Sequence, residues 1–115
     1  MNIALFASGT GSNVYNIIKY FKSSDLINVV AVLSNKSDAG ALNHAKNAGV
    51  PSLTFSKKDF TSAITVEEFL AERKVDLIVL AGFLLKVPES LIDLYPNKII
   101  NIHPALLPNY GGKGM

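Results

Sequence analysis

Five short, mostly apolar runs separated by helical or turn-like segments constrain the fold of this chain more than any other feature. They cover residues 3–7, 29–33, 52–55, 75–80 and 98–102. Runs of this kind are typical of strands that are buried on both faces, and such strands belong to parallel sheets covered by helices on both sides. The sequence therefore predicts a doubly wound, Rossmann-like α/β fold with about five parallel strands.

The segments between the runs predict helices over residues 14–21, 41–48, 65–73 and 88–94, with a turn at 59–63 before the third helix. Asp38 is a candidate N-cap of the second helix, and Gly49 marks its end. Thr65 and Glu68 fit a capping box at the start of the third. Right-handed crossovers between parallel strands make 3-2-1-4-5 the expected strand order.

Composition places the chain among globular proteins and narrows the range of its partners. The 115 residues are 49% hydrophobic with a formal net charge of +2, and no basic block is longer than Lys57-Lys58. This charge gives little attraction for nucleic acid, so small soluble ligands are favoured. The chain has no cysteine, and no apolar run approaches the about 20 residues of a membrane span. We expect one cytoplasmic domain over residues 1–115, with no membrane or nucleic-acid partner.

The fifth run and the residues after it are the strongest candidates for chemistry. Side chains alternate along a strand, so Asn101 and His103 share one face, while Ile100 and Ile102 lie on the other. Pro104 disfavours a helical conformation at His103 and so keeps it extended. An amide donor and a titratable imidazole would then lie at the carboxyl edge of the sheet, where open α/β folds bind ligands. Spacing alone leaves two alternatives, an acyl-transfer half-site or two residues that serve only packing.

A glycine-rich segment, G-T-G-S-N at residues 9–13, lies between the first run and the first helix. Bare backbone N–H groups and the helix dipole favour an anion at such a place. A dinucleotide fingerprint would need a third glycine at position 14 and an acidic residue near 34–36, and neither is present. Ser12 and Asn13 add polar groups at the helix start, which favours a phosphomonoester, although a turn that serves only packing stays open.

Weaker signals surround these two segments. Residues 82–87 follow the fourth run and could wall a pocket beside Asn101 and His103, although their pattern favours core packing. Ser8 and Ser12 are poor nucleophile candidates, because no G-x-S-x-G elbow is present and no acid is placed to orient the histidine. No carboxylate stands at ligand spacing from either histidine, so we expect no metal site.

Three motifs stand in one order along the chain: G-T-G-S-N at 9–13, L-A-G-F at 80–83 and N-I-H-P-A-L-L-P at 101–108. Together they resemble the phosphoribosylglycinamide formyltransferase family, the folate-dependent enzymes of purine synthesis, and the resemblance is colinear over all 115 residues. The third motif is shared with other formyltetrahydrofolate enzymes, including methionyl-tRNA formyltransferase and formyltetrahydrofolate hydrolase. Those two carry different sequences at the glycine loop, so the loop favours the first family.

The resemblance implies transfer of a formyl group from the co-substrate 10-formyltetrahydrofolate to the amine of glycinamide ribonucleotide, without a metal. It implies that Gly11, Ser12 and Asn13 hold the substrate phosphate. The Asn101 amide would hold the formyl oxygen. His103, at least transiently protonated, would stabilise the oxyanion of the tetrahedral intermediate and take part in proton transfer.

The resemblance also implies a folate site on the loop after the fourth strand. Its residues would be Leu84, Leu85, Lys86 and Val87, together with Asn101. Many family members carry M-R-I-L at this loop, so Leu85 stands where an arginine would be. Because the contacts to folate are made largely by backbone groups, this departure weakens the assignment only slightly.

The resemblance covers roughly the N-terminal 60% of a family member of about 190 residues. The family's catalytic aspartate, in a D-x-G-x-x-I segment, and the C-terminal half that closes the folate pocket have no counterpart in these 115 residues. We therefore expect this truncated chain to be inactive or nearly so alone. The alternatives are another formyltetrahydrofolate enzyme, such as methionyl-tRNA formyltransferase, and a non-catalytic phosphoribosyl-ligand binding module. An exposed edge at the fifth strand would also allow a homodimer.

Overall fold

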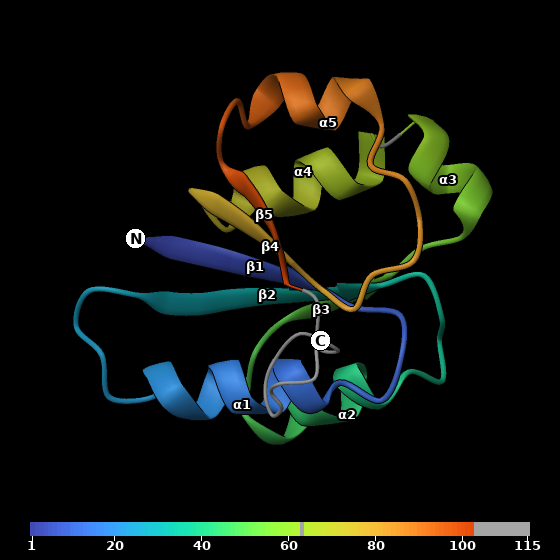
Figure 1. The fold of residues 1–115 in the computed structure, drawn as a ribbon. Coiled ribbons are helices and arrows are strands. Elements are labelled where there is room, and N and C mark those ends of the chain that lie inside the picture. The colour runs from blue at the N-terminus through green and yellow to red at the C-terminus, as the bar shows by residue number, and fades with distance from the viewer. Residues whose placement is uncertain (63, 103–115) are drawn as a thin grey trace, which may run out of the picture.

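The chain forms a five-stranded, all-parallel sheet in the computed structural model, which describes residues 1–62 and 64–102. The strands are β1 (Asn2–Phe6), β2 (Asn28–Ser34), β3 (Ser52–Thr54), β4 (Leu77–Ala81) and β5 (Ile99–Ile102). Their order across the sheet is β3-β2-β1-β4-β5 (Figure 1). Both the predicted fold class and the predicted strand order are therefore confirmed.

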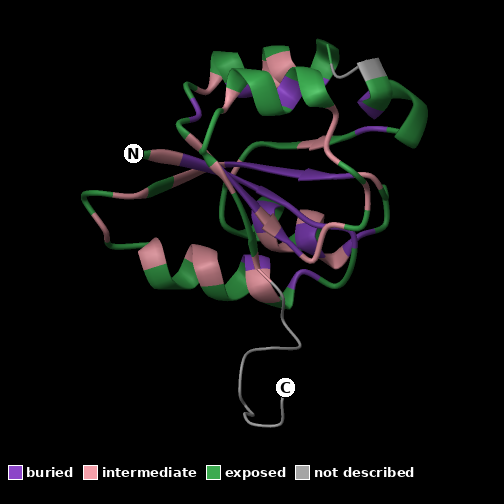
Figure 2. Cartoon of the chain, turned by 45° about the horizontal axis from the view of Figure 1, so that its top comes forward, coloured by how far each residue is buried: buried purple, intermediate pink, exposed green. Residues whose placement is uncertain are grey.

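Helices cover both faces of the sheet (Figure 1). On one face lie α1 (Ser12–Phe21) and α2 (Gly40–Asn47), and on the other α3 (Lys57–Ser62), α4 (Ile64–Glu72) and α5 (Glu89–Leu94). Strand side chains alternate between two buried clusters: Phe6 and Leu33 face α3–α5, whereas Leu5 and Val32 face α1 and α2. The central strands β1, β2 and β4 accordingly form most of the buried centre of the molecule, whereas the edge strands β3 and β5 are half-buried or exposed (Figure 2). Within the described ranges no helix is long and apolar enough to cross a membrane.

The segment between β3 and α4 differs from the prediction. The sequence predicts a turn at residues 59–63, but α3 extends over Lys57–Ser62, and residue 63 lies outside the described residues. The Ser56 hydroxyl accepts a hydrogen bond from the N–H of Asp59 at 3.0 Å, which is the contact made by an N-cap side chain. Phe60, one residue further, is buried in the core at 2% exposure. A cap outside the predicted element and the burial of one aromatic ring thus extend the helical structure.

Two predicted helix caps are wrong. α2 has Ala39 at its N-cap position, and no side chain of the described residues caps it, so Asp38 does not have this role. α4 begins one residue before Thr65, which places that residue in the first turn and not at the cap. Both helices bury apolar side chains in their first turns, Ala41 in α2 and Val66 in α4. Packing of these side chains, more than capping, sets where the helices begin.

Candidate functional site

The predicted site segments lie at one edge of the sheet because the strands that precede them are neighbours. β1 pairs with β4, and β4 pairs with β5, all in parallel. The register places Phe6 beside Leu80 and Leu80 beside Asn101. The glycine loop follows β1, and residues 82–87 follow β4. The carboxyl edge of the sheet therefore brings together the glycine loop, the loop after β4, and Asn101.

The glycine loop joins β1 to α1 and packs closely against α2. Gly11 is the N-cap residue of α1 and has φ 82°, in the left-handed region that favours glycine. A Cβ at this position would lie only 2.4 Å from the Cα of Ala41. Reciprocally, a Cβ at Gly40 would overlap the carbonyl oxygen of Thr10. Close packing of the loop on α2 thus requires glycine at position 11, whether or not a ligand binds.

The start of α1 nevertheless offers polar groups that its cap does not satisfy. No side chain of the described residues caps α1, and glycine itself has no side-chain acceptor for the N–H groups of the first turn. Ser12 is exposed and Asn13 half-buried at this helix start. Gly9 is also exposed, and a Cβ there would meet no described atom within 4 Å. An anion could therefore approach the backbone here without displacing a side chain.

Asn101 lies on β5 with an exposed side chain. Ile99 packs against the cluster on the α3–α5 face and Ile102 against the cluster on the α1–α2 face, as strand alternation requires. The Asn101 side chain thus belongs to the α3–α5 side, because it is two residues from Ile99. His103 lies outside the described residues, so its position beside Asn101 stays a prediction.

The loop after β4 alternates between residues packed in the core and residues that face solvent. Gly82 begins it with φ 77°, and the ring of Phe83 packs edge-on at 5.4 Å from both Phe6 and Phe60. The side chain of Leu84 is 74% exposed, whereas Leu85 is half-buried against the same core. The prediction that core packing dominates therefore holds for part of the loop, and Leu84 presents an apolar surface at the carboxyl edge.

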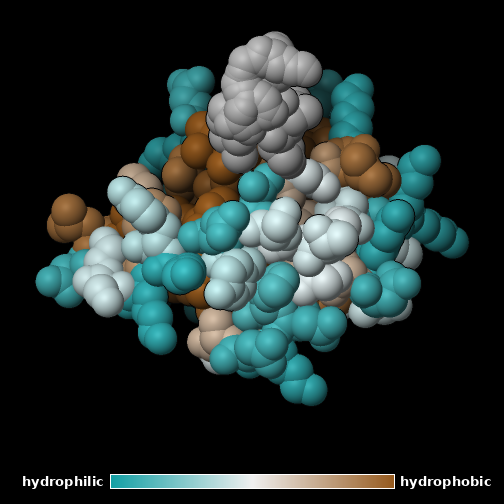
Figure 3. Space-filling view, turned by 60° about the horizontal axis from the view of Figure 1, so that its bottom comes forward, coloured by the Kyte–Doolittle hydropathy of each residue, from teal (hydrophilic) through white to brown (hydrophobic). Residues whose placement is uncertain are grey.

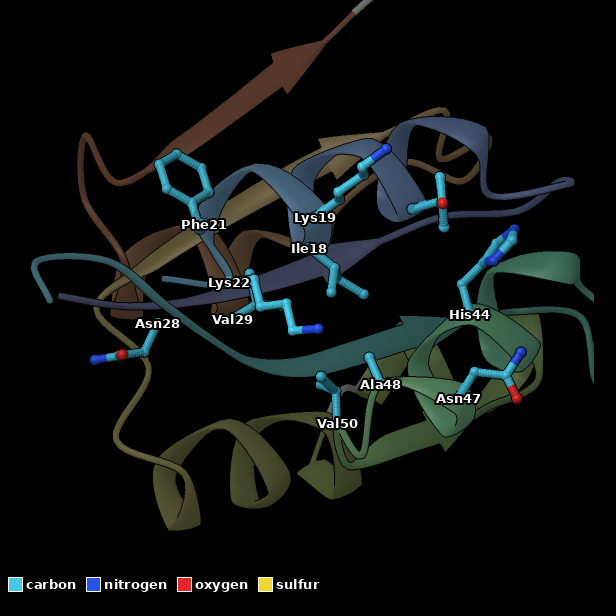
Figure 4. Close-up of a pocket in the computed structure, with 11 residues that line it drawn as sticks. Ile18, Lys19, Phe21, Lys22, Asn28, Val29, His44, Asn47, Ala48 and Val50 are labelled. Atoms are coloured by element: carbon cyan, nitrogen blue, oxygen red, sulfur yellow. The ribbon is translucent and has the colours of Figure 1, made fainter. Parts of the chain in front are cut away.

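Hollows on the described part of the molecule include two that lie beside residues discussed above. The first, of about 440 Å³, borders the loop after β4; Lys57, Phe60 and Lys86 are among its lining residues. The second, of about 620 Å³, lies between α1 and α2 and includes none of the predicted site residues (Figure 4). Lys19 and His44 line it, and the surrounding α1–α2 surface is largely hydrophilic (Figure 3). The smaller hollow, next to the predicted folate loop, is the better candidate for a ligand.

Arg73 and Asp76 lie away from the carboxyl edge. Arg73, near the end of α4, contacts Glu72 at 3.3 Å. Burial raises the pKa of Tyr95, and the nearby carboxylate of Asp76 adds to this effect. Asp76 directly precedes β4, at the amino end of the sheet. These groups bear on stability and not on the candidate site.

A family model described as "Formyl transferase" matches residues 1–115. The chain belongs to the formyl transferase family. The predicted resemblance is thereby confirmed at the level of the family.

Within the formyl transferase family, the chain is similar to phosphoribosylglycinamide formyltransferases. It is 38% identical to a phosphoribosylglycinamide formyltransferase of Haemophilus influenzae and 37% identical to one of Escherichia coli, with 96% and 97% of the chain covered. A crystal structure of the enzyme from Anaplasma phagocytophilum matches with a TM-score of 0.84 at 34% identity, covering 98% of the chain and 54% of that structure. The chain spans 54% and 55% of the length of the two bacterial relatives.

Ser8, at the carboxyl edge of the sheet in this formyl transferase chain, has a role that sequence reasoning missed. Ser8 was considered only as a nucleophile, yet its hydroxyl is buried and joins Asn35 to the backbone of Leu84. The available signal was its position: Ser8 and Asn35 each stand within two residues of the end of an apolar strand run. Polar residues at that position in neighbouring strands are placed to contact one another across the edge.

Proposed function

We propose that this chain carries the phosphate-binding part and part of the catalytic centre of a glycinamide ribonucleotide formyltransferase. In that reaction the glycinamide amine attacks the formyl carbon of 10-formyltetrahydrofolate. A new C–N bond forms, the bond from the formyl carbon to N10 breaks, and the amine proton passes to the departing nitrogen. One observation carries the proposal: a chain matched along its length by a formyl transferase model brings its glycine loop, its β4 loop and Asn101 to one edge.

The glycine loop is proposed to bind the phosphate of glycinamide ribonucleotide. Gly11, Ser12 and Asn13 surround the start of α1, where the dipole and the first-turn N–H groups favour an anion. The exposed Ser12 hydroxyl and the open space beside Gly9 support access for a phosphate.

Asn101 and His103 are proposed to act on the formyl group. The attack creates a tetrahedral carbon whose oxygen gains negative charge, and this charge is stabilised best by donors already in position. The exposed Asn101 amide supplies one such donor at the carboxyl edge. By resemblance, His103 would supply the second as an imidazolium and would exchange a proton with the reacting nitrogen atoms.

The folate co-substrate is proposed to lie against residues 84–87. The exposed side chain of Leu84, and the hollow of about 440 Å³ that Leu85, Lys86 and Val87 line, support a site for a flat, partly apolar ring system. Lys57 and Lys86 line the same hollow together with Glu89, so a net positive charge remains there to attract a folate carboxylate. The loop therefore has the apolar surface and the charge that this ligand needs.

A binding experiment tests the phosphate half of the proposal. Glycinamide ribonucleotide is titrated into the chain and the shifts of its backbone amides are followed by NMR. We expect shifts at residues 9–13 that inorganic phosphate competes away, and at least about tenfold weaker binding in Asn13→Ala, the scale of a charge-assisted hydrogen bond. Asn16→Ala, one turn further along α1 and exposed, is the matched control. Binding of glycinamide ribonucleotide that inorganic phosphate does not compete away would refute the assignment of the loop.

A transfer assay tests the catalytic half. The chain is joined to the C-terminal part of a family relative, and formylation of glycinamide ribonucleotide is measured with His103→Ala and Asn101→Ala variants. We expect each variant to lose at least about a hundredfold in kcat, the usual effect of removing a general acid–base or oxyanion group. Binding of both ligands without any formyl transfer would indicate the alternative, a non-catalytic phosphoribosyl-ligand module.

A further inference from the structure

The hydroxyl of Ser8 connects three strand ends at the carboxyl edge. It donates to Oδ1 of Asn35 at 2.6 Å and accepts from the N–H of Leu84 at 3.0 Å. Ser8 follows β1, Asn35 follows β2 and Leu84 follows β4, and β1 lies between the other two strands in the sheet. Ser8 itself is 2% exposed, so water does not readily replace either partner.

These contacts hold a part of the β4 loop that side-chain packing leaves free. The N–H of Ser8 donates to the carbonyl of Gly82 at 3.2 Å, and the ring of Phe83 is held in the aromatic core. Leu84 comes next, and its side chain is 74% exposed. The bond from its N–H to Ser8 therefore fixes the loop backbone at an exposed residue between Phe83 and Leu85, whose side chains pack against the core.

The direction of the bonds gives Asn35 a distinct role. A serine hydroxyl has one proton and two lone pairs. Since the Asn35 carbonyl accepts the proton, a lone pair remains for the Leu84 N–H. Without an acceptor at position 35 the hydroxyl is free to turn its proton elsewhere, and the bond to the loop loses its fixed geometry.

We propose that Ser8 and Asn35 are positioning residues that set the backbone of the β4 loop for binding of the folate co-substrate. This inference rests on the proposed function, because it takes residues 84–87 as the folate surface. Neither side chain needs to touch the ligand. The pair acts through the Leu84 backbone, so its loss should weaken folate binding and leave phosphate binding at the glycine loop unchanged.

Amide hydrogen exchange measured by NMR on the 115-residue chain tests the positioning step directly. In Ser8→Ala we expect the Leu84 amide to exchange at least about tenfold faster, the scale of one lost hydrogen bond. Asn35→Ala should give a smaller increase, and Asn35→Asp, which keeps an acceptor oxygen, should restore slow exchange. Ser24→Ala is the matched control, because the Ser24 hydroxyl also accepts from backbone N–H groups, those of Leu26 and Ile27, but does so in the loop before β2.

Ligand titrations test the link to folate with the same substitutions in the chain joined to the C-terminal part of a family relative, because the resemblance places the closing half of the folate pocket outside these 115 residues. With 5-formyltetrahydrofolate as a stable probe, Ser8→Ala should raise Kd at least about tenfold, again the scale of one hydrogen bond. The Kd for glycinamide ribonucleotide should stay within about twofold, so a general loss of structure would be visible as a change in both. Asn35→Asp should bind folate nearly as well as the joined chain without substitutions.

The outcomes separate this inference from the proposed function. Unchanged Leu84 exchange and unchanged folate affinity in Ser8→Ala would overturn the inference and leave the proposed function standing. Failure of the joined chain without substitutions to bind the folate probe would refute the folate surface, and with it the functional part of the inference. The exchange rate of the Leu84 amide decides in either case whether Ser8 holds the loop.

Discussion

Replacing Gly11 with alanine tests how closely the glycine loop packs on α2. The substitution has two costs. An alanine at φ 82° loses about 1 kcal/mol to left-handed strain. Its Cβ would also lie 2.4 Å from the Cα of Ala41, a backbone atom that cannot move aside without shifting α2. Overpacking of this kind costs roughly 1–3 kcal/mol more, so we expect Gly11→Ala to lower the free energy of unfolding by about 2–4 kcal/mol.

Two other glycines separate these costs. Gly49 has φ 73° but open space around its Cβ position, so Gly49→Ala should show the strain alone, about 1 kcal/mol. Gly9 also has open space and no positive φ, so Gly9→Ala should change stability by less than about 0.5 kcal/mol. Urea denaturation followed by circular dichroism gives all three values. A Gly11→Ala cost equal to that of Gly49→Ala would refute the close approach to α2.

Three further substitutions test the core, a helix cap and a titrating group. Phe60→Ala should lower the free energy of unfolding by about 3–5 kcal/mol in urea, because its buried ring stacks in the aromatic cluster. Ser56→Ala should cost about 1 kcal/mol and speed amide exchange in α3, since the hydroxyl caps that helix. Burial, then the carboxylates of Asp76 and Glu67, raise the pKa of Tyr95 above its ordinary value of about 10. The folded state therefore keeps the phenol proton longer than the unfolded state, and stability should fall as pH rises above about 10. Tyr95→Phe should lose less stability than the unmodified chain between about pH 9 and 11, and equal losses would contradict this.

The strands and their order were predictable because the central strands are buried on both faces of the sheet. Runs such as residues 3–7 and 29–33 must lie between two helical layers, and right-handed crossovers then leave few arrangements. Helix boundaries depend on smaller energies. The cap at Ser56 and the burial of Phe60 create α3 where local pattern indicated a turn. The cap is a local contact, but the burial of Phe60 depends on Phe6 and Phe83, which only the folded chain brings to it.

The polar contacts of the site were harder to predict than its location. That the glycine loop, the β4 loop and Asn101 share one edge follows from strand order alone. The contact of Ser8 with Asn35 and Leu84 depends also on register and on the turn at Gly82, which the sequence pattern does not specify. His103 lies outside the described residues, so its role continues to rest on the resemblance.

The two glycines of the loop show why a motif and its chemistry must be argued separately. Gly11 would be required by its backbone conformation and by Ala41 even in a protein that bound no phosphate. Its presence therefore supports the fold more than the ligand. Packing makes no such demand at the exposed Ser12 or at Gly9, where the described structure leaves open space. Evidence for a phosphate site must come from these positions and from Asn13, and a Gly9→Ala variant that folds normally but binds glycinamide ribonucleotide less tightly would supply it.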